Sequence, residues 1–214
     1  MIGVLGGTFD PIHFGHLRTA LEVQEALGLA EVRFVPLRVA PHRPPPLATP
    51  EQRLAMVRAA VAGATGFVAD DRELRREGRS FTYDTLRSLR AELGTAVPLC
   101  LILGGDAFAD FYTWHRPDDI LELAHLVVME RPNTARPADP RLVHLISERS
   151  TRETERLRAA AGGAVFFQRV TQLEISASKI RRLIADGLNP RFLTPEAVLE
   201  IMGDERLYRC QTLR

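Results

Sequence analysis

An uninterrupted apolar run in the middle of the chain most constrains how this sequence can fold. The segment PLCLILGG, residues 98–105, shows no alternation of polar and apolar positions. A strand of this kind is buried on both faces, as in a parallel sheet covered by helices on either side. Shorter apolar runs before and after it alternate with segments of helical spacing. This order predicts an α/β fold with an open, mainly parallel, doubly wound (Rossmann-like) sheet.

The expected elements follow this alternation along the chain. Strands are expected at residues 1–7, 31–37, 67–70, 98–105, 125–131 and 163–170. Helices are expected at residues 15–29, 49–63, 80–94, 106–112, 117–124, 176–187 and 194–203, where apolar residues recur at helical spacing. Thr49 is the expected N-cap of the second of these helices. The proline-rich segments 40–50 and 131–141 are expected to be loops.

Length and charge limit the domain organisation and the partners. A chain of 214 residues is within the usual range for one domain, so we expect a single domain over 1–214, with a helical C-terminal part from about residue 171. The net charge of +1 gives no bulk attraction to nucleic acid or membranes. There is no basic N-terminal region and no apolar stretch near the roughly 18 residues that span a bilayer, which predicts a cytoplasmic protein.

The opening segment MIGVLGGTFDPIHFGH carries residues that add little to a core. Gly6 and Gly7 close the first expected strand, at the sheet edge where ligands bind in such folds. They would let backbone N–H groups approach a phosphate, although a tight strand-to-helix turn would use the same pair. His13 and His16 share one face of a helix start and can donate to phosphate oxygens. A metal pair is the alternative for the histidines, but no third ligand lies at a suitable spacing.

A second segment, ISASKIR at residues 175–181, has the chemistry of a phosphate site near the end of the chain. Ser176 is a candidate helix N-cap, and Ser178 and Arg181 lie three apart on one face. Hydroxyls and a guanidinium at a helix N-terminus can hold a triphosphate. An ordinary capped helix with a solvated arginine is the alternative.

Both segments resemble motifs of a known superfamily. GGTFDPIHFGH resembles the glycine-Phe-Pro-His-x-Gly-His motif of the nucleotidylyltransferases, whose histidine pair is similar to the HIGH motif of class I aminoacyl-tRNA synthetases. Thr8 and Asp10 make it similar to the nicotinate-nucleotide adenylyltransferase family in particular. ISASKIR resembles the superfamily's Ile-Ser-x-Ser/Thr-x-Ile-Arg motif. The two motifs stand in the family's order, about 160 residues apart.

Three internal segments extend the resemblance over nearly the whole chain. PHR at residues 41–43 resembles a loop that reads Pro-His-Lys in the family, so Arg43 replaces a lysine with a fork of the same charge. SFTYDTLRSL resembles the Tyr-Thr-x-Asp-Thr-Leu segment, with Phe81 where tyrosine is common. LGGDAFADFYTWHR resembles the Gly-x-Asp…Trp-x-Arg segment, with Gly105 where many members have alanine.

The resemblance implies adenylyl transfer in NAD biosynthesis. The phosphate of nicotinate mononucleotide attacks the α-phosphorus of ATP and pyrophosphate leaves, without a general base because the attacking group is already an anion. Mg²⁺ is expected to travel with ATP and pyrophosphate, with no metal ligand assigned to the protein. ATP and nicotinate mononucleotide are therefore the expected partners, and a homo-oligomer is left open.

The same resemblance assigns roles to matched positions. The expected catalytic residues are His13, His16 and Arg181. The expected ATP-binding residues are Gly7, Thr8, Phe9, His13, His16, Gly104, Asp106, Ser176, Ser178 and Arg181. The expected binding residues for the nicotinate nucleotide are Asp10, Arg43, Thr85, Tyr112, Trp114 and Arg131. For Trp114 the alternative is core packing, and for Asp106 it is a helix N-cap.

The nicotinate pocket is expected to favour the acid over its amide. Trp114 can stack on the pyridine ring, and stacking does little to separate the two. The Thr85 hydroxyl and backbone N–H groups at Tyr112 to Trp114 would donate to the carboxylate.

Three other functions share parts of the pattern. A pantetheine-phosphate adenylyltransferase or a cytidylyltransferase would share both phosphate motifs, but not the Thr-Tyr-Asp-Thr and Trp-His-Arg segments. A fragment of a tRNA synthetase would share the histidine pair, but the chain has no room for an anticodon domain. A nucleotide sensor without activity would keep the fold and would not need His16 and Arg181.

Overall fold

The sheet is parallel throughout the part of the chain that the structure describes. The structure is a computed structural model and describes residues 1–39, 45–130 and 139–209. Its strands are β1 (Ile2–Gly7), β2 (Glu31–Pro36), β3 (Phe67–Ala69), β4 (Leu99–Gly104), β5 (His125–Glu130), β6 (Ser150–Thr151) and β7 (Val165–Arg169). They lie in the order β3-β2-β1-β4-β5-β7-β6, and each neighbouring pair is parallel. The predicted α/β class and parallel sheet are confirmed.

Helices cover both faces of this sheet. They are α1 (Phe14–Leu27), α2 (Pro50–Val61), α3 (Thr82–Leu93), α4 (Gly105–Ala109), α5 (Pro117–Leu123), α6 (Pro140–Arg149), α7 (Thr154–Ala159), α8 (Ala177–Ala185) and α9 (Glu196–Asp204), with the 3₁₀ turn η1 at Phe111–Thr113. One core cluster joins α1, α2 and α7 to the sheet, and a second joins α3, α4, α5 and α6 to it. The sheet is therefore doubly wound. No helix in the described ranges is long and apolar enough to cross a membrane.

The caps of several helices agree with the sequence. Thr49 accepts a hydrogen bond from the Gln52 N–H at the start of α2, as predicted. Gly28 ends α1 with φ of 60°, in the left-handed region that glycine tolerates. Gly94 follows α3, where the sequence predicts its end.

The segment after residue 139 differs from the sequence-based expectation. Asp139 caps α6 and Pro140 is its first residue, so the loop expected through residue 141 ends earlier. The helices α6 and α7 and the two-residue strand β6 have no counterpart among the predicted elements. The strand β6 and the helix α7 are too short to leave a clear periodicity, whereas α6 has ten residues and begins inside the proline-rich segment expected to be a loop.

The strand order places the topological switch point, where open α/β sheets have their ligand crevice, at the centre of the sheet. From β1 the chain winds outward through β2 and β3, then returns to β4 on the other side of β1. Ligands of open α/β sheets bind at such a reversal, beyond the carboxyl ends of the strands. The pairing of Ile2 with Leu99, carried forward along both strands, sets Gly7 level with Gly104. Two glycines expected to bind ATP, Gly7 and Gly104, thus border this point.

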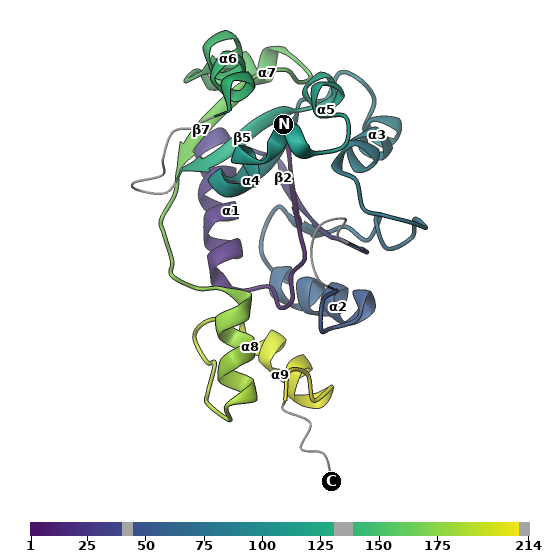
Figure 1. The fold of residues 1–214 in the computed structure, drawn as a ribbon, viewed down its shortest axis with the longest axis vertical. Helices are drawn as coiled ribbons and strands as arrows, with labels where there is room; N and C mark the ends of the chain where they lie inside the picture. Colours follow the sequence, from purple (N-terminus) through teal and green to yellow (C-terminus); the bar gives the residue numbers. More distant parts are fainter. Residues whose placement is uncertain (40–44, 131–138, 210–214) are drawn as a thin grey trace.

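The C-terminal helices lie beside the start of α1. Figure 1 shows α8 and α9 beyond the sheet, close to α2 and to the beginning of α1. The Phe14 N–H donates to the Leu193 carbonyl at 3.0 Å, and the Thr194 hydroxyl donates to the Ile12 carbonyl at 2.8 Å. These contacts bring the end of the chain to the opening motif. The grouping of 1–214 into one domain stays a prediction.

Candidate active site

The carboxyl ends of β1 and β4 expose bare backbone. A Cβ added at Gly6 or at Gly104 would meet no other atom within 4 Å. Gly6 is exposed, although it belongs to a strand at the centre of the sheet. No packing in the described structure therefore explains these two glycines, whereas a phosphate approaching the backbone would.

Gly7 is required for a different reason, namely a contact with another residue of the same motif. A Cβ at Gly7 would lie 2.8 Å from ring atoms of Phe9. Phe9 has φ of 49° and is buried, with its ring 6.1 Å from that of Phe34 and 5.1 Å from that of His16, centroid to centroid. The turn after β1 therefore folds the Phe9 ring back beneath the strand end, and Gly7 leaves room for it.

His13 and His16 lie face to face at the start of α1. Their ring centroids are 3.7 Å apart, with an angle of 25° between the planes. His13 is the N-cap residue, and its backbone N–H donates to Nδ1 of His16 at 3.3 Å. A neutral imidazole that accepts at Nδ1 carries its proton on Nε2. The backbone therefore selects the form of His16 in which Nε2–H is a donor.

Burial keeps both histidines uncharged near neutral pH. Desolvation lowers the pKa of His13 to about 4. Desolvation, and next the neighbouring His13, lower the pKa of His16 to about 3. His13 is only 6% exposed, and within the described residues its Nδ1 has no hydrogen-bond partner. An arriving polyanion would meet neutral N–H donors.

Gly15 supports this arrangement, and the sequence reasoning did not single it out. A Cβ at Gly15 would lie 2.9 Å from Nδ1 and 3.0 Å from Cε1 of His13. It would also lie 3.5 Å from the carbonyl oxygen of Ile175. The glycine between the histidines therefore lets the His13 ring lie against the first turn of α1. Its place inside the quoted motif was the signal available.

The two predicted phosphate motifs meet at Arg181 and Asp10. The Arg181 Nη1 donates to the backbone carbonyl of Asp10 at 2.7 Å and lies 3.8 Å from its carboxylate. The guanidinium side chain is 29% exposed, so it remains accessible from solvent. The structure thus brings Arg181 from α8 to the turn that follows β1, next to the histidine helix.

Asp10 is occupied by contacts within the protein. Its carboxylate accepts hydrogen bonds from the N–H groups of Leu47 at 2.9 Å and Ala48 at 3.1 Å, and from the Tyr208 hydroxyl at 2.7 Å. Burial raises the pKa of Tyr208, and the bond to Asp10 raises it further. Direct contact between Asp10 and the nicotinate nucleotide stays a prediction. The observed contacts tie the opening motif to the chain before α2 and to its C-terminal end.

Arg53, in α2, supports the turn that follows β1, and the sequence did not reveal this role. It is fully buried in α2, and its Nη1 donates to the carbonyl of Thr8 at 2.8 Å. Its other nitrogens donate to the carbonyls of Ala48 and Arg38, both at 3.4 Å. The carbonyl of Thr8 therefore faces the protein. An arginine within an ordinary helical pattern gives no sign of such a role.

The remaining residues expected around ATP lie at helix starts. Ser176 is the N-cap of α8, as predicted, and its hydroxyl accepts from the Lys179 N–H at 3.2 Å. Ser178 is exposed in the first turn of that helix. Asp106 is exposed in the first turn of α4, whose N-cap is Gly104, so Asp106 is not the N-cap that the alternative interpretation expected. Their contact with ATP stays a prediction.

The two segments expected around nicotinate pack against each other. The rings of Phe81 and His115 are 4.6 Å apart, centroid to centroid, and Arg116 lies over the Tyr83 ring at 4.0 Å. These contacts join the first turn of α3 to the segment that follows Trp114. Tyr112 and Trp114 are partly buried against the second core cluster, so each keeps an accessible part.

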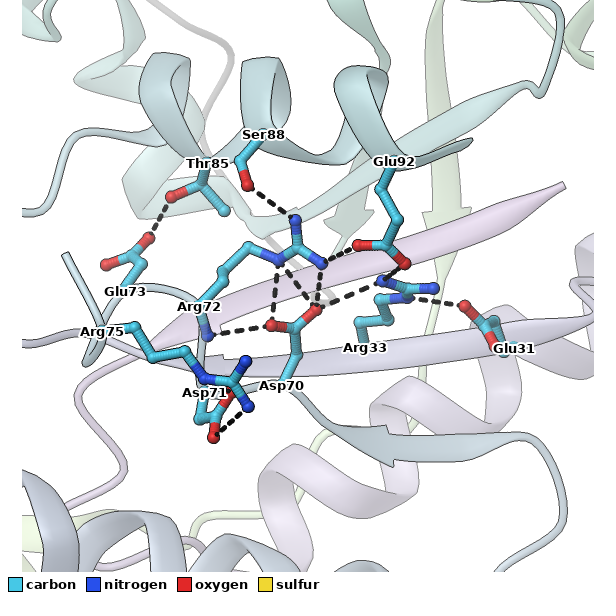
Figure 2. A network of polar contacts seen from close by, with 10 residues as sticks. All are labelled: Glu31, Arg33, Asp70, Asp71, Arg72, Glu73, Arg75, Thr85, Ser88 and Glu92. Carbon is cyan, nitrogen blue, oxygen red and sulfur yellow. Dashed lines mark hydrogen bonds and ion pairs between the residues drawn. The ribbon is translucent and has the colours of Figure 1, made fainter. Parts of the chain in front are cut away.

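The donors expected to read the nicotinate carboxylate already have partners. The Thr85 hydroxyl donates to Oε1 of Glu73 at 2.5 Å (Figure 2). The backbone N–H groups of Thr113 and Trp114 donate to carbonyls of their own turn, at 2.9 Å and 3.1 Å. The expected source of acid specificity therefore conflicts with these contacts. Nearby, the start of α3 has no side-chain cap at Phe81.

Two predicted residues cannot be placed. Arg43 and Arg131 lie outside the described residues. Within the described ranges, no group of three or more His, Cys, Asp or Glu side chains is arranged to hold a metal ion.

Comparison with known proteins identifies relatives along almost the full chain. The profile of the cytidylyltransferase-like family matches residues 4–183. A protein of Methylococcus capsulatus named "Probable nicotinate-nucleotide adenylyltransferase" is 48% identical over 209 residues, covering 97% of this chain and 99% of the relative. A protein of the same name from Halorhodospira halophila is 50% identical over 197 residues, covering 92% and 90% of the two chains.

One solved structure has the same fold at low identity. The nicotinic acid mononucleotide adenylyltransferase of Plasmodium falciparum, solved in complex with NaAD, aligns with a TM-score of 0.73. The alignment covers 97% of this chain and 96% of the other, at 16% sequence identity.

Proposed function

The chain belongs to the nicotinate-nucleotide adenylyltransferase family, within the cytidylyltransferase-like proteins, and we propose that it transfers the adenylyl group of ATP to nicotinate mononucleotide in NAD biosynthesis. The products are nicotinate adenine dinucleotide and pyrophosphate. The observation that carries the chemical part of the proposal is the pair of neutral, stacked histidines next to the crevice between β1 and β4.

The reaction needs alignment and charge stabilisation. The phosphate of nicotinate mononucleotide is an anion near neutral pH, so it attacks the α-phosphorus without giving a proton to the protein. Negative charge builds on the oxygens around that phosphorus, and preorganised donors stabilise it. The Nε2–H of His16, whose orientation the His13 backbone fixes, is one such donor.

Arg181 and the glycines complete the phosphate side of the proposal. Arg181 is held at the carbonyl of Asp10, where its remaining N–H groups can meet the leaving pyrophosphate. Exposed backbone at Gly6 and Gly104 leaves room for the two nucleotides along the crevice. ATP enters as its magnesium complex, with the ion on phosphate oxygens and water, which is the usual way Mg²⁺ is bound with nucleotides. Such substrates support a cytoplasmic location.

Acid specificity is assigned to backbone donors. The first N–H groups of a helix have no intrahelical partner, and α3 begins without a side-chain cap. The Asp84 and Thr85 N–H groups already donate to the Phe81 carbonyl, which in the described structure leaves the N–H groups of Thr82 and Tyr83. We place the nicotinate carboxylate at these N–H groups, beside the predicted residues Tyr112 and Trp114. A carboxamide would turn an N–H toward at least one of these donors and leave it without an acceptor.

A panel of acceptors tests the proposal. Pyrophosphate release is followed with ATP and either nicotinate mononucleotide, its amide, or phosphopantetheine. We expect the acid to be preferred over its amide by at least about tenfold in kcat/KM, since a hydrogen bond to a charged group contributes roughly 1.5–3 kcal/mol. Equal use of acid and amide would remove the acid preference, and use of phosphopantetheine alone would contradict the proposed function.

A further inference from the structure

A buried carboxylate lies directly behind the site expected for the acceptor nucleotide. Glu73 belongs to the segment between β3 and α3 and is only 3% exposed. Its Oε1 accepts the hydrogen bond of the Thr85 hydroxyl at 2.5 Å. Figure 2 shows these two side chains pointing toward each other, apart from the ion pairs around Asp70. Burying a carboxylate costs free energy unless it is hydrogen-bonded or paired with a positive charge, so the position of Glu73 needs an explanation.

The segment that carries Glu73 has contacts at both of its ends. Beside Glu73, the Ser80 side chain opposes the rise of the Glu73 pKa, while the second carboxylate oxygen, Oε2, is buried and has no hydrogen-bond partner within the described residues. Ser80 in turn holds the chain where it leaves β2. Its hydroxyl accepts from the Arg38 N–H at 2.9 Å, and its own N–H donates to the Val39 carbonyl at 3.1 Å. Glu73 therefore joins its own segment to the first turn of α3, and Ser80 joins the end of that segment to the chain after β2.

These contacts also fix what Thr85 can offer a ligand. A threonine hydroxyl has one proton, and here that proton is directed to Glu73. Toward any other group the hydroxyl can only accept. The Thr85 side chain is itself buried, so its main effect on a ligand comes through the backbone of the first turn of α3.

Burial acts against the charge of Glu73, and hydrogen bonds act for it. Desolvation raises the pKa of Glu73, while the Ser80 side chain, the bond from Thr85 and the charge of Arg76 oppose that rise. The carboxylate of Asp70 acts in the same direction as burial. The hydrogen bond from Thr85 and the charge of Arg76 are therefore the main contacts that make a charge at this position tolerable.

Resting on the function proposed above, we propose that Glu73 is a positioning residue for the acceptor half of the site. Its carboxylate, through Thr85, holds the first turn of α3 against the segment between β3 and α3. It touches no reacting atom. Its loss therefore loosens binding of nicotinate mononucleotide and leaves the ATP half, built on β1, α1 and α8, in place.

Kinetics with both substrates separate this role from a general loss of stability. We expect Glu73→Leu to raise the KM for nicotinate mononucleotide about tenfold or more, with the KM for ATP within about twofold, because a hydrogen bond to a charged group is worth roughly 1.5–3 kcal/mol. Glu73→Gln, whose amide oxygen can still accept from Thr85, is expected to show a smaller rise of about threefold and decides the matter if Glu73→Leu does not fold.

Glu92→Leu is the matched control. Glu92 is a carboxylate on α3, the helix that carries Thr85, and it is bonded to Arg72 and Arg33 (Figure 2). Unlike that of Glu73, its side chain is 47% exposed. We expect both KM values of this variant to stay within about twofold of those of the wild type, because a half-exposed ion pair contributes little.

A double-mutant cycle then tests whether Glu73 acts through Thr85. If it does, Glu73→Leu combined with Thr85→Val raises the KM for the acceptor no more than the larger single change, whereas independent effects would add. Parallel rises in both KM values, an unchanged acceptor KM in Glu73→Gln, or full additivity would overturn the proposal. A wild-type enzyme that releases no pyrophosphate with nicotinate mononucleotide would instead overturn the proposed function.

Discussion

Each residue of the histidine pair has a distinct task at the start of α1. His13 caps the helix and supplies the N–H that orients His16, while His16 keeps the Nε2–H that faces outward from this bond. The stacking distance of 3.7 Å between ring centroids leaves neither ring free to rotate without moving the other. A change at either position therefore affects both.

Loss of the His16 imidazole should slow the chemical step more than it weakens binding. We expect His16→Ala to lower kcat by about 10²–10³, the usual cost of one preorganised donor, with a smaller change in the KM for ATP. Steady-state kinetics on a variant with wild-type circular dichroism gives the answer. A near-normal kcat would rule out this role for His16.

The buried histidines should also make stability depend on pH. The pKa of His13 is lowered to about 4 in the folded state, against about 6.5 for an unperturbed histidine, so between these values the unfolded chain binds the extra proton. Stability should therefore fall as pH decreases from about 6.5 to 4, by at most about 1.4 kcal/mol per pH unit for this group.

Urea unfolding at pH 7 and pH 5 measures this effect in the wild type and in His13→Asn. The variant lacks the titrating ring, so we expect it to lose less free energy of unfolding between the two pH values. Identical pH dependence in the two proteins would show that His13 is not buried in its neutral form.

At the scale of elements, the ends of β1 and β4 decide where ligands can lie. Gly6 and Gly104 face open space, while Gly7 and Gly15 are required by the rings of Phe9 and His13. In the opening motif, packing inside the protein thus explains Gly7 and Gly15, whereas it does not explain Gly6. The C-terminal helices add to the same place, because Arg181 and Tyr208 both bind Asp10.

The substitution Gly6→Ala tests whether the space at Gly6 is needed by a bound ligand and not by the packing of the protein. The added Cβ meets nothing within 4 Å, so we expect the melting temperature to change little. We expect the KM for ATP to rise at least about tenfold, since a displaced or ill-fitting substrate readily loses 1.4 kcal/mol. Gly203→Ala is the matched control, because Gly203 also faces open space but lies in α9. An unchanged KM for ATP in Gly6→Ala would place the nucleotide elsewhere.

For the molecule as a whole, the sequence predicts the fold better than the contacts of the site. Repeated apolar runs determine the class because each buried strand needs covering helices on both sides. Between residues 140 and 160, α7 and β6 were missed because they are short, and α6 because it begins inside the proline-rich segment expected to be a loop. Ser176 and Thr49 were predicted correctly as N-caps, since capping chemistry is local.

Long-range contacts could not be read from the sequence. Nothing local shows that Arg53 binds the carbonyl of Thr8, or that Glu73 takes the proton of Thr85. Arg53 and Thr8 are 45 positions apart in the sequence, and Thr85 and Glu73 are 12 positions apart. The family resemblance implied which segments converge, whereas the partner of each hydrogen bond depends on how the elements pack.

The stereochemistry of transfer tests the central claim most directly. Nicotinate mononucleotide is incubated with ATP that carries sulfur at the α-phosphorus in one known configuration, and the configuration of the dinucleotide product is determined. Direct in-line attack by the acceptor phosphate, with His16 only donating a hydrogen bond, should give the dinucleotide with its configuration inverted. A retained configuration would mean two displacements through a covalent adenylyl-enzyme and would contradict the account.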